Sequence, residues 1–333
     1  MGLLVQKFGG TSTATPESRA LLYQKALEAA AENQLIVVVS AMGRVGAPYA
    51  TDTLLNMLKD EYAETEKREL DMIFNCGEAI AGCLIAAGLQ KRGKRAAYLT
   101  GWQAGIITEK KYTDAGILRI ERKRLNDYLN QGFIVLVGGG QGITEDGEIT
   151  TLGRGGSDTT ACSIGVAVDA DRIEVYTDVN GIMTADPRVV ENAVLLPSIS
   201  HTDCINFANC GAKVMHPRAV EAGRQKEHIP LYVKSTFSDQ VGTLIGTPAG
   251  KDMTKTYLVG ATSTAGDKTL LSLIGANLSK SGLMTECSEL LAANELPFSD
   301  LCLNDRIVSL KVKAADANRA LNLLHNLVVK YLL

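Results

Sequence analysis

Residues 133–142 read FIVLVGGGQG, and this stretch indicates how the first 245 residues or so are organised. Its five consecutive apolar residues predict a central strand of a sheet that is covered on both faces, and the glycines after it predict a loop at the strand's carboxyl end. Two earlier stretches repeat this pattern, LLVQKFGGTS at 3–12 and LIVVVSAMG at 35–43. Together they predict the centre of a mainly parallel sheet.

Helical segments and further strands lie between and after these three stretches. Thr15 and Pro16 suit the cap and first turn of a helix that continues to about Asn33. Asp146 and Gly147 are a hairpin turn signal. The other expected elements are helices at 69–92 and 157–168 and strands at 96–100, 172–177 and 231–234. This alternation predicts an α/β sandwich.

The segment GTPAGKDMTK at 246–255 is polar and rich in helix and strand breakers, so we expect a domain boundary there. The predicted domains are 1–247 and 256–333. The second is expected to be a small α+β domain with the order βαββα. Its elements are a strand at 269–274, a helix at 281–294, strands at 297–302 and 306–312, and a helix at 314–329.

Composition narrows the possible functions. The chain has 333 residues, enough for about two domains, and 46% of them are hydrophobic. Its net charge of −3 provides no overall basic field, so nucleic acid and anionic membranes are not expected partners. No uninterrupted apolar run reaches the roughly 18 residues of a membrane span. The seven cysteines form no Cys-x-x-Cys pair and favour free thiols in a reducing cytoplasm.

The glycine-rich stretches lie where open α/β sheets bind their ligands, beyond the carboxyl ends of strands. They are KFGGTS at 7–12, SAMG at 40–43 and GGGQG at 138–142. Glycines leave backbone N–H groups accessible to phosphate oxygens, and Lys7 adds a positive charge. Neither GxxxxGK[ST] nor GxGxxG after the first strand is present, which argues against a P-loop protein and a dinucleotide fold.

TLGRGGSDTTA at 151–161 is the densest candidate segment. Arg154 offers a planar fork for a carboxylate, and the amides of 155–157 suit an anion at a helix start. Asp158 would then grip an ammonium group or orient a loop lysine. The alternative interpretation is an ordinary helix start, with Ser157 as the N-cap and Asp158 in the first turn.

YTDVNGIMTADPR at 176–188 leaves a strand and is long, polar and poor in apolar anchors. Asp178 and Asp186 are candidates to face a nucleotide or its Mg²⁺, and Arg188 is a candidate for phosphate; the alternative is a hydrated loop. Glu78 lies in an apolar helix, where an unpaired carboxylate is costly, so we expect it to bind a ligand ammonium. Lys213 suits either phosphate binding or a solvated surface.

These motifs, in this order, resemble the aspartate kinases of the amino-acid kinase superfamily. SAMGRVGAPYATDTLL at 40–55 is most similar to the Gram-positive, diaminopimelate-pathway type. The resemblance implies the three-layer amino-acid kinase fold. The matching stretches are VQKFGGTS at 5–12, SAMG at 40–43, ATDTLL at 50–55, CGE at 76–78, TGWQAG at 100–105, TLGRGGSDTTA at 151–161, YTDVNGIMTADPR at 176–188, GAKVMHPRAVE at 211–221 and STFSD at 235–239.

The resemblance also implies a role for each matching residue. Lys7 would be the catalytic cation that bridges donor and acceptor, and Asp158 would organise it. Arg154 would bind the α-carboxylate of aspartate and Glu78 its ammonium group. The implied aspartate-binding residues are Thr51, Glu78, Arg154, Gly155, Gly156 and Ser157. The implied ATP-binding residues are Lys7, Phe8, Gly9, Gly10, Ser40, Thr177, Asp178, Met183, Thr184, Ala185, Asp186, Pro187, Arg188, Lys213 and Val214. Mg²⁺ would be carried by ATP.

The implied activity is phosphorylation of the L-aspartate side-chain carboxylate by ATP to give 4-phospho-L-aspartate. This is the first step of the aspartate-family pathway to lysine and diaminopimelate, threonine and methionine. The nucleophile is already ionised at neutral pH, so the chemistry needs positive charge rather than a general base.

The C-terminal region departs from the family pattern. GANLSKSGLMTECSELLAANELPFSD at 275–300 resembles the second of two ACT modules, and the first is missing. Ser281-Gly282 replaces the Gly-Pro that often opens the ACT helix. The resemblance implies a homodimer through this ACT-like domain.

Two other functions remain open. One is a kinase for another carboxylate, such as acetylglutamate; Arg154 with Glu78 favours a free amino acid instead. The other is a catalytically inactive amino-acid sensor that works through its ACT-like domain; Lys7, Arg154 and Asp158 argue against it.

Overall fold

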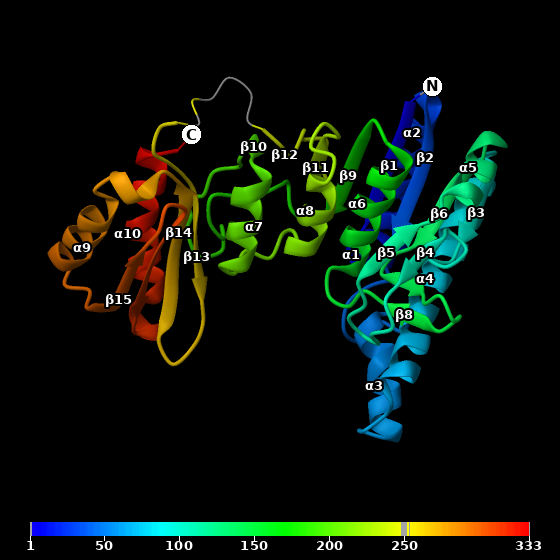
Figure 1. Ribbon diagram of the computed structural model, residues 1–333, viewed down its shortest axis with the longest axis horizontal. Helices are drawn as coiled ribbons and strands as arrows, with labels where there is room; N and C mark the ends of the chain where they lie inside the picture. Colours follow the sequence, from blue (N-terminus) through cyan, green and yellow to red (C-terminus); the bar gives the residue numbers. More distant parts are fainter. Residues whose placement is uncertain (1, 248–251, 253, 333) are drawn as a thin grey trace. The chain divides into compact units, whose positions relative to one another are not determined.

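The computed structural model describes residues 2–247, 252 and 254–332, shown as a ribbon in Figure 1. Two compact units can be distinguished. The first contains the chain up to Asn180 together with Arg218–Val241, and the second contains Gly181–Pro217 together with the chain from Gly242 onward.

A parallel sheet forms the centre of the first unit, as predicted. Its strand order is β11-β9-β1-β2-β6-β3, and every neighbouring pair is parallel. The strand bounds are β1 Gly2–Phe8, β2 Asn33–Val39, β3 Ala96–Leu99, β6 Ile134–Gly138, β9 Arg172–Thr177 and β11 Leu231–Ser235. The carboxyl ends of β1, β2 and β6 therefore lie side by side at one edge of the sheet.

Helices cover both faces of this sheet. Helices α2 (Pro16–Glu32) and α4 (Lys67–Gln90) pack on one face, where Leu4 and Phe8 join the buried hydrophobic cluster. Helix α6 (Gly156–Val168) packs against β1, β2 and β9. Side chains alternate along a strand, so Lys7 lies on the face opposite Phe8. The three-layer α/β prediction is thus confirmed.

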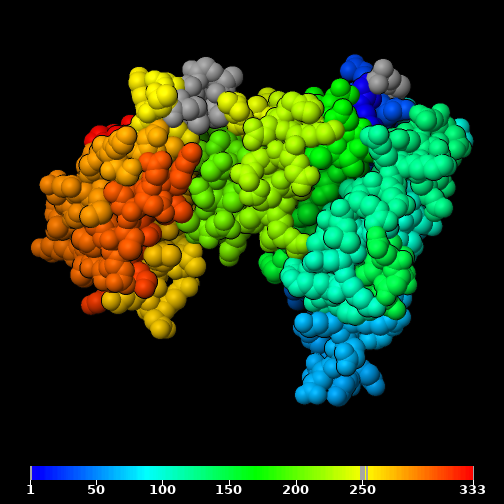
Figure 2. Space-filling view, viewed as in Figure 1, coloured from blue at the N-terminus to red at the C-terminus, as the bar shows by residue number. Residues whose placement is uncertain are grey.

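A smaller sheet and several short helices complete the first unit. The small sheet has the order β5-β4-β7-β8, and Gly147, at φ 92°, forms the predicted hairpin turn between β7 and β8. Helix α3 packs on α4 and projects from the rest of this unit in Figure 2. The bounds are β4 Ile106–Thr108, β5 Ile117–Ile120, β7 Gln141–Ile143, β8 Ile149–Thr151, α1 Gly10–Ala14, α3 Thr51–Glu61, α5 Lys123–Asn130 and α8 Pro217–Arg224.

Helix α4 is, by length and composition alone, apolar enough to cross a membrane. It nevertheless packs against β3, β6 and β8 and buries the polar residues Asp71, Asn75 and Glu78. We therefore interpret α4 as a core helix of the sandwich.

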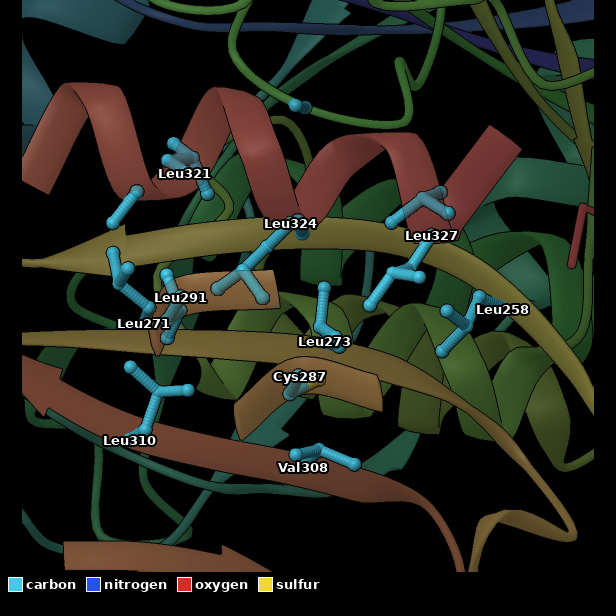
Figure 3. Packing of buried hydrophobic residues seen from close by; sticks show 14 of the residues in the cluster. Leu258, Leu271, Leu273, Cys287, Leu291, Val308, Leu310, Leu321, Leu324 and Leu327 are labelled. Atoms are coloured by element: carbon cyan, nitrogen blue, oxygen red, sulfur yellow. The ribbon is translucent and has the colours of Figure 1, made fainter. Parts of the chain in front are cut away.

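The second unit is built on an antiparallel sheet with the order β13-β14-β16-β15. Helices α9 and α10 cover one face, and Figure 3 shows their leucines meeting those of the sheet. Helix α7 packs on β13 and β14, and β10 pairs with β12 in parallel. The bounds are α7 His201–Asn209, β10 Ser198–Ile199, β12 Thr243–Ile245, β13 Tyr257–Thr264, β14 Thr269–Ala276, α9 Leu283–Ala293, β15 Phe298–Leu303, β16 Ile307–Val312 and α10 Ala317–Lys330.

Within the C-terminal region the sequence analysis missed strand β13, so the order there is ββαββα rather than βαββα. Gly260 interrupts the apolar pattern of YLVGATST and therefore resembles the end of a strand in the sequence. In the structure it sits beside a register shift, where an added Cβ would lie 2.7 Å from the Thr184 carbonyl oxygen. The glycine thus permits a close approach and does not end the strand.

The compact units also divide the chain differently from the predicted boundary. The second unit includes 181–217 as well as the C-terminal region, and 248–251 and 253 of the predicted linker lie outside the described residues. Asp203 of α7 explains the difference. Its buried carboxylate accepts a hydrogen bond from the Tyr257 hydroxyl at 2.7 Å and pairs with Arg306 at 3.2 Å.

We expect Asp203→Ala to lower the free energy of unfolding by about 2 kcal/mol, because the buried Tyr257 hydroxyl loses its acceptor. Urea denaturation followed by circular dichroism measures the change. The matched control is Asp267→Ala at an exposed position. Equal stability of the two variants would show that this contact does not hold α7 to the sheet.

Candidate functional site

The site is built around Lys7, which lies near the end of the central strand β1. Its ammonium group is 2.6 Å from a carboxylate oxygen of Asp158 in the first turn of α6, and both side chains are largely buried. The Asp158 carboxylate thus compensates the charge of the largely buried lysine side chain. The contact agrees with the interpretation that Asp158 orients the loop lysine.

Three glycine-rich loops meet at this edge of the sheet. The Gly43 N–H donates to the Gly10 carbonyl at 2.9 Å, and the Gly139 N–H donates to the Val39 carbonyl at 2.9 Å. A Cβ on Gly10 would lie 2.6 Å from the Gly43 carbonyl oxygen. Contact this close requires glycine at position 10, and it brings backbone groups from separate segments next to one another.

The start of α6 joins the same group of loops. Gly155 has φ 69° and is the N-cap of the helix, which begins at Gly156. The expected N-cap Ser157 is therefore wrong, whereas Asp158 does lie in the first turn. Instead, the Ser40 hydroxyl donates to the Ser157 hydroxyl at 2.9 Å. An added Cβ on Gly139 would come within 2.4 Å of the Ser157 side chain. Two predicted binding segments, 40–43 and 154–158, are thereby in direct contact.

Arg154 lies just before this helix and is exposed. Among the described residues, no hydrogen bond or ion pair involves its side chain. The guanidinium is therefore accessible to the carboxylate of a small ligand.

Glu78 is, after Arg154, the second side chain in the site whose polar atoms are not all paired among the described residues. Its side chain is 2% exposed, one oxygen accepts from the Ala41 N–H at 3.2 Å, and the other has no hydrogen-bond partner among the described residues. Burial raises the pKa of Glu78 to about 8, although the Ala41 N–H and the Thr51 hydroxyl favour the charged form. A cationic ligand group beside it would restore the missing interaction.

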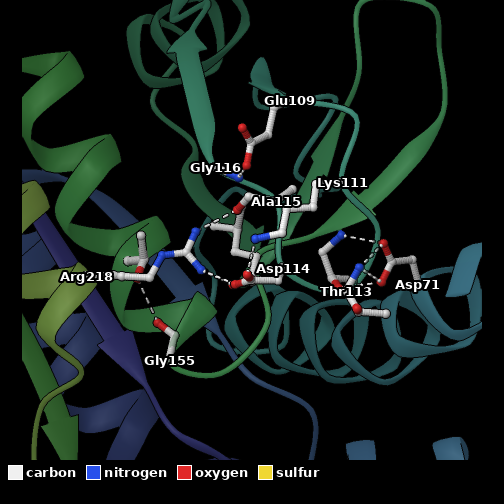
Figure 4. Close-up of polar contacts among 12 residues, drawn as sticks. Asp71, Glu109, Lys111, Thr113, Asp114, Ala115, Gly116, Gly155 and Arg218 are labelled. Atoms are coloured by element: carbon white, nitrogen blue, oxygen red, sulfur yellow. Dashed lines mark hydrogen bonds and ion pairs between the residues drawn. The ribbon is translucent and has the colours of Figure 1, made fainter.

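Sequence reasoning missed two residues that hold the surrounding loops, both drawn in Figure 4. Buried Asp71 accepts hydrogen bonds from the Thr113 and Thr151 N–H groups and so ties α4 to β8 and a neighbouring loop. Burial raises its pKa. The sequence feature that could have revealed Asp71 is the spacing of positions 71, 75 and 78, which places all three polar residues on one face of α4.

Arg218 is the other missed residue, directly after the proline that begins α8. Its guanidinium donates to the carbonyls of Ala115 at 2.7 Å and Leu152 at 2.9 Å and to the Asp114 carboxylate at 2.8 Å. Leu152 lies two residues before Arg154, so Arg218 helps to fix the loop that carries the exposed arginine.

The predicted ATP-binding residues of the first unit differ in accessibility. Phe8 is fully buried and stacks on Tyr176 with ring centroids 4.7 Å apart, so only its backbone can face a ligand. Thr177 is half-buried at the end of β9. Asp178 is more exposed and forms an ion pair with Arg44, which directly follows the glycine-rich stretch 40–43.

The other predicted ATP-binding residues lie in the second unit. Asp186 forms an ion pair with Arg188 at 2.6 Å; this hydrogen-bonded contact lowers the Asp186 pKa, and the charge of Lys213 contributes further. Thr184 and Ala185 are buried. The set in this unit is Met183, Thr184, Ala185, Asp186, Pro187, Arg188, Lys213 and Val214, and its joint action with Lys7 stays a prediction.

We expect the stability of Glu78→Gln relative to the original chain to increase with pH. The folded chain holds the Glu78 proton more tightly than the unfolded chain, so stability is lost as pH rises from about 4.5 to about 8. The variant lacks this loss, and its advantage should grow by at least about 1.4 kcal/mol between pH 6 and pH 9. Urea denaturation at both pH values tests this, with exposed Glu66→Gln as the control. A pH-independent difference would contradict the raised pKa.

Comparisons with known proteins identify relatives of this chain. The chain is 45% identical over 265 residues to aspartokinase 1 of Bacillus subtilis, covering 78% of this chain and 65% of that protein. It is 44% identical over 246 residues to an aspartokinase of Geobacillus stearothermophilus and covers 59% of it. The chain thus spans about three fifths of the length of the curated relatives that it matches first.

A solved structure of aspartate kinase from Synechocystis aligns with a TM-score of 0.65 at 35% identity, covering 99% of this chain and 56% of that chain. Escherichia coli aspartokinase III, solved with aspartate and ADP, aligns with a TM-score of 0.81 at 21% identity over 97% of this chain and 99% of that chain, which shows a shared fold. Residues 2–235 match the sequence pattern of one described family. The chain belongs to the amino acid kinase family.

Proposed function

We propose that this chain transfers the γ-phosphoryl group of ATP to the side-chain carboxylate of L-aspartate, giving 4-phospho-L-aspartate. The observation that carries this proposal is the Lys7 ammonium group, held 2.6 Å from Asp158 at the edge where three glycine-rich loops meet. A fixed cation where glycine-rich loops meet is suited to bringing a phosphate and a second anion together.

Two groups near this edge suit a free amino acid as the acceptor. The Arg154 guanidinium is exposed and matches an α-carboxylate. The unpartnered oxygen of buried Glu78 matches an ammonium group. An acetylated amine would leave that carboxylate without a charge partner, so the pair favours aspartate over acetylglutamate. The names of the similar relatives support the same substrate.

The mechanism follows from charge. A side-chain carboxylate is ionised at neutral pH and attacks the γ-phosphorus without a general base. The barrier comes from repulsion between this anion and the triphosphate, so positioning and charge neutralisation supply most of the catalysis. Lys7 bridges the two anions, and Asp158 prevents the lysine side chain from turning away.

ATP is the proposed phosphoryl donor, and Mg²⁺ accompanies it. Mg²⁺ neutralises phosphate charge when it is bound, and carboxylate oxygens are the protein ligands that suit it. Asp178 and Asp186, in the segment 176–188, are the carboxylates that would face it, and Arg188 and Lys213 would contact phosphate. We assign no protein ligand to this Mg²⁺, which ATP would carry.

The proposal extends to the setting of the enzyme. The reaction would be the first step of the aspartate-family pathway, in the cytoplasm, with no nucleic acid or membrane as partner. We also propose a homodimer through the ACT-like domain at 256–333. β15 lies at an edge of the C-terminal sheet, and an edge strand can pair with a second copy. The mass in solution tests this part.

An ATP-dependent hydroxamate assay, which traps the acyl phosphate with hydroxylamine, tests the activity. We expect turnover with aspartate. Turnover only with N-acetylglutamate would replace aspartate as the substrate. Tight aspartate binding without turnover would instead identify an amino-acid sensor.

Lys7→Ala is expected to lower kcat by at least about a hundredfold, because it removes the charge that stabilises the transferring phosphoryl group. Lys110→Ala is the matched control, since Lys110 forms an exposed ion pair with Asp146 away from the loops. Circular dichroism should show that both variants are folded. A folded Lys7→Ala protein with near-original kcat would remove Lys7 from the mechanism.

A further inference from the structure

The proposed nucleotide-binding segment 183–188 and the adjacent Val189 are attached by hydrogen bonds to two elements, β13 and α10, of the C-terminal module, which is defined here as residues 256–332. The Ala261 N–H of β13 donates to the Thr184 carbonyl at 2.8 Å. On α10, the Asn322 amide donates to the Val189 carbonyl at 2.9 Å, and a His325 ring nitrogen lies 2.8 Å from the Thr184 hydroxyl. These contacts all lie within the second unit.

Apolar contacts fix the same segment. Ala185 and Val190 belong to the hydrophobic cluster that also contains Leu271, Leu324 and Leu327. Figure 3 shows these three leucines between α10 and the sheet. The buried side of the segment is therefore part of the core of the C-terminal module, whereas Arg188 is exposed.

His325 is unusual in its surroundings. It is 1% exposed and lies on the apolar face of α10, where a leucine would fill the same position. The Val194 N–H donates to the Thr184 hydroxyl at 2.9 Å, so the hydroxyl proton is free to point to the His325 nitrogen. Burial lowers the pKa of His325, which keeps the ring neutral and able to accept.

Thr184 thus makes four hydrogen-bonded contacts. Its carbonyl accepts from β13, its N–H donates to the Val194 carbonyl, and its hydroxyl contacts both the Val194 N–H and His325. Asp186 and Arg188 follow within four residues. A short segment held at this point has little freedom to move the side chains that follow it.

We propose that His325 and Asn322 of α10 are positioning residues that hold the segment 183–188 in its nucleotide-binding form. This inference rests on the proposed function, because that function assigns the segment to ATP. The C-terminal module then supplies part of the structural support for nucleotide binding, and this role requires no effector. A residue of α10 that touches no substrate would set the affinity for ATP.

The primary test compares His325→Leu with His325→Gln, which retains a polar group. We expect His325→Leu to raise the KM for ATP roughly tenfold, while kcat and the KM for aspartate change less than about twofold. A roughly tenfold weaker affinity for ATP corresponds to the loss of about one hydrogen bond. His325→Gln should recover part of the loss. Asn326→Ala, on the exposed side of the same helix, is the control and should match the original chain.

Asn322→Ala covers the case in which His325→Leu fails to fold, because Asn322 is exposed. We expect a smaller rise in the KM for ATP, with the KM for aspartate unchanged. A folded His325→Leu with the original KM for ATP would overturn the proposal. Equal changes in both KM values, or no change in Asn322→Ala, would also overturn it.

A calorimetric titration with ADP, which measures the Kd directly, separates this inference from the proposed function. If the original chain binds ADP but does not phosphorylate aspartate, the proposed function fails, and the Kd of His325→Leu for ADP still decides the inference: a weakened Kd supports it and an unchanged Kd overturns it. If the original chain does not bind ADP, both proposals fail.

Discussion

The site of the first unit depends on close backbone contact at one edge of a parallel sheet. The register of β1, β2 and β6 brings their carboxyl ends together. There, Gly10 approaches the 41–43 segment and Gly139 approaches Ser157 at distances that exclude a side chain. Without this constraint the glycine-rich loops would not meet beside Lys7, whose ammonium group lies 3.4 Å from where a Cβ on Gly9 would be. The proposed chemistry therefore depends first on main-chain packing, which places the charged side chain of Lys7 among the loops.

Two buried titratable side chains in this unit illustrate different consequences of desolvation. Lys7 has a carboxylate partner in Asp158, so its charge is compensated within the chain. Glu78 has only partial compensation, and burial raises its pKa to about 8. A group left in this state destabilises the folded chain unless a ligand completes it. Lys7, the proposed catalytic cation, is thus paired before any ligand binds, whereas Glu78 lacks a partner that the proposed ligand ammonium would supply.

The second unit changes how the C-terminal region is understood. Residues 181–217 share a core and hydrogen bonds with the C-terminal sheet, through Thr184 and Asp203 among others. The C-terminal region therefore does not fold separately from the rest of the chain, because residues 181–217 belong to the same compact unit. The proposed nucleotide-binding segment takes its shape from residues more than 100 positions later in the chain.

The sequence by itself determined the parallel strands, the glycine-rich loops at their ends, and the candidates Lys7, Asp158, Arg154 and Glu78, because apolar runs, turn glycines and an acid in an apolar helix are local signals. It did not reveal β13, whose Gly260 resembles a break. It also did not reveal the structural roles of Asp71, Arg218 and His325. Periodicity indicates which face of an element is buried, but only the tertiary structure decides which distant group meets it. Hydrogen bonds between such groups leave no local pattern.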